Sequence, residues 1–452
     1  MSLSRKYFEI VPINNIDSFS PDAGVDIINF LIPPVAGASL PTSDLVLKGN
    51  LQVLSDNDAG TTYSNGSAVG AAIDNVAGMQ SAISRVDVTS RQGNSLLEQR
   101  QFYSLISKVK RGILSNDDLG VGKYGVQQMA GENATNTKWK LMRANNADEG
   151  TPFAMPIDIG LFTTNNQQLN LSATGGLEVK IFLNSTKQFL MNLDTGSGNK
   201  LNNNFSYRLT NVSLFGRYNF LTAPALKTLN GVQFKQISNT INTVQSNNDT
   251  TALIPQVQSL DKIIYIYQPN DDTLNNFDAD GVSTDQLVGL SQYGVSNNGT
   301  RFPYSFDIKS NPSLGELAPA TQSSNKHRTT GDAEVSRHFI TAINGSYPPQ
   351  HSLVTGLNQE RSLADAYGIN GTGGEPTNLF GNYVMGVATS YQYGFAGYDT
   401  PMPNNLVQLE QESEVGTANT VVPTVISGQT QSQNALMVYN TMLSYSGMSV
   451  QK

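Results

Sequence analysis

Short runs of alternating apolar and polar residues, separated by turns, are the dominant pattern of this chain. In the clearest run, residues 177–183, four aliphatic side chains fall on one face of a strand and Glu178 and Lys180 fall on the other. A period of two is typical of a half-buried antiparallel strand. Residues 260–267 are the densest in β-branched and aromatic side chains, which strongly favours a second strand of this kind.

The same pattern predicts further strands in both halves of the chain. They cover residues 25–32, 45–53, 83–88, 153–161 and 207–214, a strand that begins at Val232, and residues 302–308 and 436–445. The polar stretches between them contain many of the 40 glycines and 19 prolines, and such stretches favour turns. We expect long loops at residues 55–72, 120–150, 271–300 and 368–403.

Two segments have helical spacing instead. Ser95 and Glu98 stand three residues apart, as in a capping box, and an apolar stripe then follows at Phe102, Leu105, Ile106, Val109 and Ile113. This pattern predicts a helix that packs its stripe against a sheet edge. A second short helix is predicted over residues 332–344, with Asn344-Gly345 as its C-cap.

Length and pattern together predict an all-β protein built from two similar units. The 452 residues exceed what one small core needs, and no repeat of about 20 to 50 residues is detectable. Thr222-Ala223-Pro224-Ala225 resembles a hinge. We therefore predict a first unit at residues 1–222 and a second at residues 223–452.

The charge of the chain argues against direct nucleic-acid binding. Lys and Arg number 28 against 36 Asp and Glu, which gives a net charge of −8, and the sequence pI is about 5.0. Neutralising phosphates requires clustered basic residues. The longest basic cluster, Lys108, Lys110 and Arg111, lies on the predicted first helix, and we interpret it as a solvated surface.

Several kinds of chemistry are excluded by composition. The chain has no cysteine and only three histidines, so disulfides, thiol nucleophiles and Cys-ligated metals are ruled out, and a histidine-based metal site is not expected. No apolar run reaches the roughly 18 residues of a membrane span. Residues 1–10 lack the apolar stretch of a secretory signal, so we expect synthesis and assembly inside a cell.

One string resembles a catalytic motif, the Asp194-Thr195-Gly196-Ser197 loop of aspartic peptidases. That chemistry needs two carboxylates that share one proton. The candidates for a second loop, Asp22-Ala23-Gly24 and Asp58-Ala59-Gly60, do not fit the motif. A turn between strands is the favoured interpretation of residues 194–197.

The remaining motifs also favour structural roles. Gly196–Lys200 and Gly120–Lys123 lack the Ser or Thr that follows the lysine of a phosphate-binding loop, and Asp278–Gly281 lacks the glutamate at the twelfth position of a calcium loop. His338 and Glu334 lie one helical turn apart, as in a local supporting pair. We therefore predict no catalytic residue, no cofactor-binding residue and no metal site.

The order of three segments resembles a known family. They are residues 83–103, the stretch from Phe153-Ala154-Met155-Pro156-Ile157 to Gly160-Leu161-Phe162, and residues 176–181. This arrangement resembles the double jelly-roll major capsid proteins of Polinton-like viruses and virophages. The resemblance implies two side-by-side eight-stranded antiparallel jelly rolls with long loops and a few short helices. It also implies homotrimers that act as pseudo-hexagonal capsomers of an icosahedral shell, and it implies no enzyme activity.

The resemblance implies partners within a virion: neighbouring capsomers and penton and minor capsid proteins. It leaves open whether an internal membrane underlies the shell. We expect the four long loops to form an outer crown or trimer contacts. The N-terminal arm, with Arg5 and Lys6 ahead of Tyr7 and Phe8, either reaches a neighbour or an inner component or is a frayed end. The alternatives are a trimeric β-sandwich receptor-binding spike or penton-type virion protein and, third, a peptidase that uses Asp194.

Overall fold

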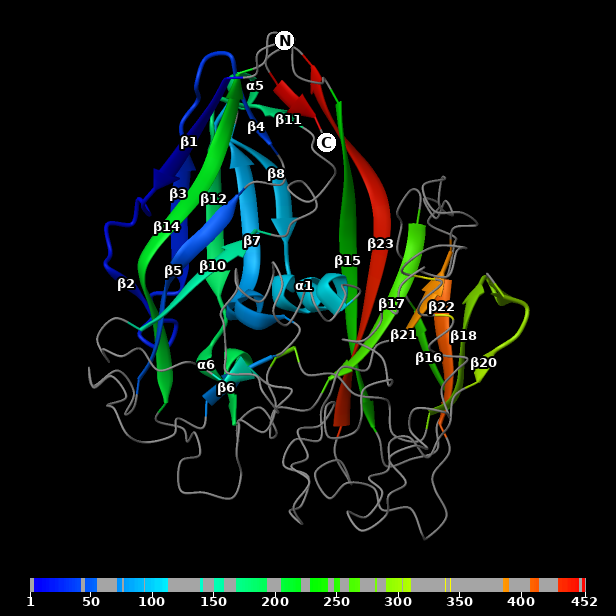
Figure 1. The fold of residues 1–452 in the computed structure, drawn as a ribbon. Helices are drawn as coiled ribbons and strands as arrows, with labels where there is room; N and C mark the ends of the chain where they lie inside the picture. Colours follow the sequence, from blue (N-terminus) through cyan, green and yellow to red (C-terminus); the bar gives the residue numbers. More distant parts are fainter. Residues whose placement is uncertain are drawn as a thin grey trace.

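Two β structures stand side by side in this computed structural model, and both chain ends lie at the same end of the molecule (Figure 1). The structure describes residues 4–41, 45–54, 71–74, 77–92, 94–112, 139–140, 150–157, 168–192, 205–220, 228–242, 248–252, 260–268, 281–282, 290–302, 304–309, 338, 342, 385–389, 407–413, 430–446 and 449–451.

The first β structure is a sandwich of two main antiparallel sheets. One sheet has the order β10 (Thr151–Pro156), β5 (Val46–Leu54), β14 (Ser206–Phe220), β4 (Ala38–Pro41) and β11 (Gln168–Asn170), and both β1 (Ser4–Ile10) and β2 (Ser18–Phe19) also pair with β14. The other has the order β3 (Ile27–Ile32), β12 (Leu177–Leu183), β7 (Ile83–Ser90) and β8 (Ser95–Arg100). A small third sheet joins β13 (Met191–Asn192), β6 (Ala71–Ile73) and β9 (Trp139–Lys140).

A single apolar core fills this sandwich. The predicted alternation of residues 177–183 is confirmed, because β12 alternates strictly between buried and partly exposed positions. Phe30 from one sheet and Leu47 from the other are both fully buried in the same cluster. In the same core the Phe189 and Tyr207 rings pack edge to face, with centroids 4.8 Å apart.

The second β structure repeats this layout with two five-stranded sheets. One contains β15 (Thr228–Asn242), β23 (Thr430–Ser446), β17 (Leu260–Gln268) and β21 (Met385–Ala388), with β24 (Ser449–Gln451) paired to β23. The other contains β16 (Asn248–Ala252), β22 (Val407–Ser413), β18 (Leu290–Asn297) and β19 (Thr300–Arg301), with β20 (Ile308–Lys309) paired to β18. Tyr265 and Tyr293 join the two sheets in one core, their ring centroids 6.1 Å apart.

Pairing between described strands stays within each half of the chain. The strands up to Phe220 pair with one another, and so do the strands from Thr228 onward. The predicted boundary between residues 222 and 223 lies outside the described residues and stays a prediction. The predicted count of eight strands in each jelly roll also stays a prediction.

The predicted start of the first helix is wrong. Residues 95–100 form strand β8, which pairs with β7, and the helix α1 runs from Tyr103 to Gly112. The spacing of a capping box is satisfied, but Ser95 and Glu98 both lie in the strand, where the Glu98 carboxylate accepts a hydrogen bond from Arg100. The apolar stripe is confirmed at Leu105, Ile106 and Val109, all buried, and α1 packs against β7 and the 3-10 helix η1 (Gly78–Ala82). Two further single turns are α5 (Leu171–Thr174) and α6 (Thr186–Phe189).

Two other predictions are wrong because short or polar strands carry little periodicity. Residues 290–297 and 385–388 were expected in loops, yet they form β18 and β21 and have buried positions, so these parts cannot belong to an outer crown. Conversely, the expected strand at residues 302–308 falls in the gap between β19, which ends at Arg301, and β20, which begins at Ile308. Of the predicted second helix only His338 and Ala342 are described, and both are helical.

The segment predicted as an N-terminal arm forms strand β1. All seven of its residues pair with β14, from Ser4 opposite Phe220 to Ile10 opposite Leu214. The Phe8 ring stacks on Tyr218 with centroids 4.4 Å apart, and it occupies the space that a side chain at Gly216 would fill. Packing of this partly buried ring against the core holds the segment on the sandwich, so the frayed end is wrong, whereas contact of this strand with a neighbour or an inner component stays a prediction.

We expect Gly216→Ala to destabilise the first sandwich, because the new Cβ would overlap the Phe8 ring and lie 3.0 Å from Leu45 Cδ2. The free energy of unfolding should fall by about 1–3 kcal/mol, as for other overpacked sites. Chemical denaturation measures this change, and hydrogen exchange should show β1 opening. In a Phe8→Ala background the same substitution should cost much less. Equal costs in both backgrounds would contradict the predicted contact.

Candidate functional site: a buried polar junction between the two halves

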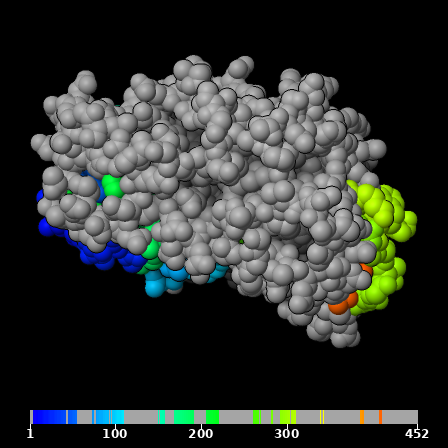
Figure 2. All heavy atoms as spheres, turned by 90° about the horizontal axis from the view of Figure 1, so that it is seen from below, coloured from blue at the N-terminus to red at the C-terminus, as the bar shows by residue number. Residues whose placement is uncertain are grey.

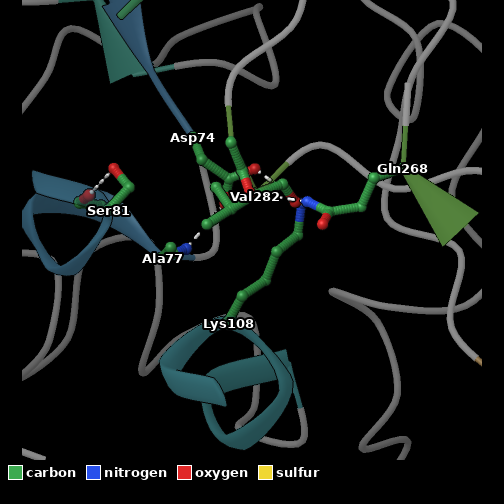
Figure 3. A network of polar contacts seen from close by, with 8 residues as sticks. Asp74, Ala77, Ser81, Lys108, Gln268 and Val282 are labelled. Carbon is green, nitrogen blue, oxygen red and sulfur yellow. Dashed lines mark hydrogen bonds and ion pairs between the residues drawn. The ribbon is translucent and has the colours of Figure 1, made fainter. Parts of the chain in front are cut away.

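A lysine side chain connects the two halves of the molecule. Lys108 extends from α1, and its Nζ lies 2.8 Å from Asp74 Oδ2 and donates to the Val282 carbonyl oxygen at 2.5 Å (Figure 3). Asp74 follows β6 of the first half, whereas Val282 belongs to the second. Only 1% of the lysine side chain and 5% of the aspartate side chain are exposed.

This result overturns the prediction that Lys108 belongs to a solvated basic face. Lys108 lies three residues after Leu105 and next to Val109, so helical geometry places it at the border of the buried stripe. Its charge suggested a solvated position, but a charged side chain is tolerated in an interior when it is paired and hydrogen-bonded. The side chains of Lys110 and Arg111 lie outside the described residues.

The carboxylate of Asp74 is held in place by the start of η1. Its Oδ1 accepts a hydrogen bond from the Ala77 backbone N–H at 2.7 Å, and its own carbonyl accepts from Gly78 at 2.9 Å. The Ser81 hydroxyl donates to the Gly78 carbonyl at 2.6 Å and closes the turn. Each carboxylate oxygen therefore has a partner, which offsets part of the cost of burying the charge.

The second half is also held by two hydrogen bonds of Gly281, the residue before Val282. Gln268, at the end of β17, donates its side-chain amide to the Gly281 carbonyl at 2.7 Å. The Gly281 backbone N–H donates to the Gln188 carbonyl, in α6 of the first half, at 2.8 Å. Val282 itself is fully buried. Residues 281–282 are therefore fixed from both halves at once.

Further buried polar contacts position α1 itself. The Tyr103 hydroxyl donates to Gln80 Oε1 at 2.5 Å, and the Gln80 amide donates to the Pro156 carbonyl at 2.6 Å. Just before the helix, Arg100 and Glu98 form a second ion pair, 1% and 0% exposed. Because hydrogen bonds are directional, these contacts define the orientation of α1 more narrowly than apolar packing alone would.

The sequence motifs that suggested chemistry fall mostly outside this site. Asp194, Gly196–Lys200 and Gly120–Lys123 lie outside the described residues, as do Asp278 and Glu334. Gly281, the last residue of the suspected calcium loop, is part of the junction. The described residues contain no group of three His, Asp or Glu side chains placed to hold a metal ion. None of the helices in the described part of the chain has the length and apolarity of a membrane span.

The described groups with shifted pKa values each have a structural explanation. Burial raises the pKa of Tyr207 well above its usual value, as do the Asp22 and Asp26 charges, and its hydroxyl donates to the Asn184 carbonyl. A hydrogen bond from Asn29 lowers the pKa of Glu178. These groups lie in separate places, so they do not form the coupled pair of carboxylates that acid–base catalysis by a peptidase requires.

Sequence analysis missed the junction because its members are far apart in the chain. Asp74 stands alone after an apolar stretch, and Val282 and Gly281 contribute only backbone atoms. The only signal available was the position of Lys108 beside the apolar stripe of the helix. That position is also common for exposed lysines, whose stems lie along apolar surface.

We expect Lys108→Met to weaken the contact between the halves, since it leaves the Asp74 carboxylate buried without its counter-ion. Breaking a buried pair in this way costs about 3–5 kcal/mol of unfolding free energy. Urea denaturation measures the cost, and hydrogen exchange should show faster opening at Val282. The matched control is Lys309→Met, which removes an exposed lysine bonded to Gln292 and should change stability by less than about 0.5 kcal/mol.

A second variant separates the charge effect from the loss of packing. Lys108→Met combined with Asp74→Asn leaves no buried charge and should recover part of the lost stability. If Lys108→Met proved as harmless as Lys309→Met, the junction would not hold the halves together.

Comparison with known proteins identifies the fold. No protein-family model and no curated protein sequence matches the chain. Among solved structures, the chain is similar to a protein in the cryo-EM structure of the Sputnik virophage, with a TM-score of 0.56, 10% identity, and coverage of 99% of this chain and 88% of that one. PBCV-1 VP54, fitted into a reconstruction of Sputnik, gives a TM-score of 0.55 at 10% identity and covers 100% of this chain and 97% of its own.

A third structure, a quasi-atomic model of the PBCV-1 virus capsid, gives a TM-score of 0.54 at 10% identity, with 100% of this chain and 97% of that chain covered. At this identity the likeness establishes the fold, and it extends over essentially the whole chain. The predicted all-β, double jelly-roll architecture is therefore confirmed, and this chain has the fold of these virus capsid proteins.

Proposed function

We propose that this protein is a viral major capsid protein whose homotrimers form the pseudo-hexagonal capsomers of an icosahedral shell. The observation that carries the proposal is the match of both halves at once to proteins of virus particles, over 99% of the chain for Sputnik and 100% for PBCV-1 VP54. The proposal places the protein in the virion, after assembly inside the host cell.

The junction supports this function because it makes one rigid unit out of two jelly rolls, which we assign to residues 1–222 and 223–452. Three copies of a rigid double unit place six similar β structures around a three-fold axis. The Lys108 contacts with Asp74 and Val282 set the spacing of the two within each copy. With a loose connection, the distance between the two jelly rolls would differ from copy to copy. Repeated symmetric contacts close a shell only when their geometry is constant.

Composition supports assembly rather than catalysis. Only 14% of residues are charged, against about 25% in ordinary soluble domains. Amide and hydroxyl side chains suit broad, partly hydrated interfaces in which hydrogen bonds set the register. We propose neighbouring capsomers and penton and minor capsid proteins as partners, no sequence-specific nucleic-acid contact, and no enzyme activity.

Light scattering and negative-stain microscopy on the purified protein test the proposal. We expect trimers with hexagonal outlines that grow, as concentration rises, into sheets or closed particles. A fixed oligomer that binds a receptor or glycan and never grows would instead support the spike alternative. A monomer at every salt and protein concentration would contradict both assemblies.

A further inference from the structure

Strand β3 combines an edge position with an uncharged apolar sequence. It ends the sheet β3-β12-β7-β8, and among the described strands it pairs only with β12. Its six residues, Ile-Ile-Asn-Phe-Leu-Ile, include no charged residue, proline or glycine. Segments of this composition pair readily with copies of themselves when an edge is open. The strand lies on the side of the sandwich away from β15 and β23 (Figure 1), and the view from below shows the N-terminal residues, in dark blue, at the outer margin of the molecule (Figure 2).

The other edge strands of this sandwich carry features that oppose the addition of a further strand. Strand β1, which pairs with β14, has three charged residues among its seven. Strand β10 contains two prolines, and β11 is three residues long. Strand β8, at the far edge of the sheet that contains β3, carries the buried Glu98 and Arg100. Charges on an edge, inward-pointing charges, prolines and short length all hinder edge-to-edge pairing, and the sequence of β3 has no charge and no proline.

Residues 11–16 lie against the free side of β3, and we call them the edge cap. They connect β1 and β2, which both belong to the opposite sheet. The Ile13 N–H donates to the Asn29 carbonyl at 2.8 Å, and the Asn29 N–H donates to Asn14 Oδ1 at 2.8 Å. The Asn14 side-chain amide donates to the Ile27 carbonyl at 3.2 Å. Alternate residues of a strand direct their backbone groups to the same side, so these three groups are ones that an added strand would bind.

We propose that the edge cap, through the Asn14 side chain, keeps β3 from pairing with β3 of a second copy. A primary amide offers both a donor and an acceptor, so this one side chain binds the edge as the peptide groups of an added strand would. The segment that fits the edge when the cap opens is β3 itself, because an antiparallel pair of two such uncharged strands brings no like charges together. The inference concerns the single chain and does not rest on the proposed function.

The variant Asn14→Ala removes the two hydrogen bonds that the side chain makes with the edge. Their loss should raise the fraction of molecules with an open edge about tenfold or more. Hydrogen–deuterium exchange followed by mass spectrometry should show this increase at residues 27–32. In light-scattering and thioflavin-T time courses, at concentrations below those at which the wild type assembles, the variant should form β-rich aggregates that the wild type does not form.

A second substitution separates an open edge from a general loss of stability. Ile27 is 38% exposed, and a lysine on an edge strand opposes the addition of another strand. Asn14→Ala combined with Ile27→Lys should therefore keep the fast exchange at residues 27–32 but lose the aggregation. The matched control is Gln101→Ala, which removes an exposed amide bonded to the exposed side chain of Gln99 and should behave like the wild type.

Two results would overturn the inference. If Asn14→Ala aggregated no faster than Gln101→Ala, the edge cap would not protect β3. If the double variant aggregated as fast as Asn14→Ala, the aggregates would arise from unfolding rather than from pairing at this edge. Failure of the proposed function is a separate observation, a wild type that never forms trimers, and the comparison among these variants would be unaffected by it.

Discussion

The architecture depends on one buried ammonium group. Lys108 leaves a helix of the first jelly roll, pairs with Asp74 beneath it and bonds to a backbone carbonyl of the second jelly roll. A buried charge strongly penalises any arrangement that leaves it unpaired, so the correct placement of the halves is separated from alternatives by several kcal/mol. Apolar contact alone would allow the two surfaces to slide with little cost.

The consequence for function is geometric. In the proposed role as a capsid subunit, the contribution of the chain is to present several surfaces at constant angles. The junction fixes one of these angles inside the chain. Under this proposal, stability of the single chain and assembly of many chains depend on the same few polar contacts.

The sequence predicted the fold well where side-chain periodicity reports burial. Residues 177–183 and 260–267 alternate or cluster as strands buried on one face or both, and their positions were predicted closely. Prediction failed where tertiary contacts override local pattern. Residues 95–100 had the spacing of a helix start, yet pairing with β7 made them a strand. Strand β21 is too short to show a period, and it is specified by its neighbour β17.

The junction could not be predicted for a related reason. Its three members are separated by 34 and 174 residues along the chain, and one of them contributes only a carbonyl. Lys108 was interpreted as surface because a lone lysine gives no sign of its partner. Similarly, residues 5–8 are interpreted as an arm because nothing near them in the sequence shows that Phe8 packs over Gly216, in a strand far along the chain.

A cryo-EM reconstruction of the purified oligomer tests the central claim most directly. The account predicts six β-sandwich densities around a three-fold axis, joined in pairs through the helix that carries Lys108. A particle in which the two sandwiches of one chain take variable orientations, or one without three-fold symmetry, would contradict it.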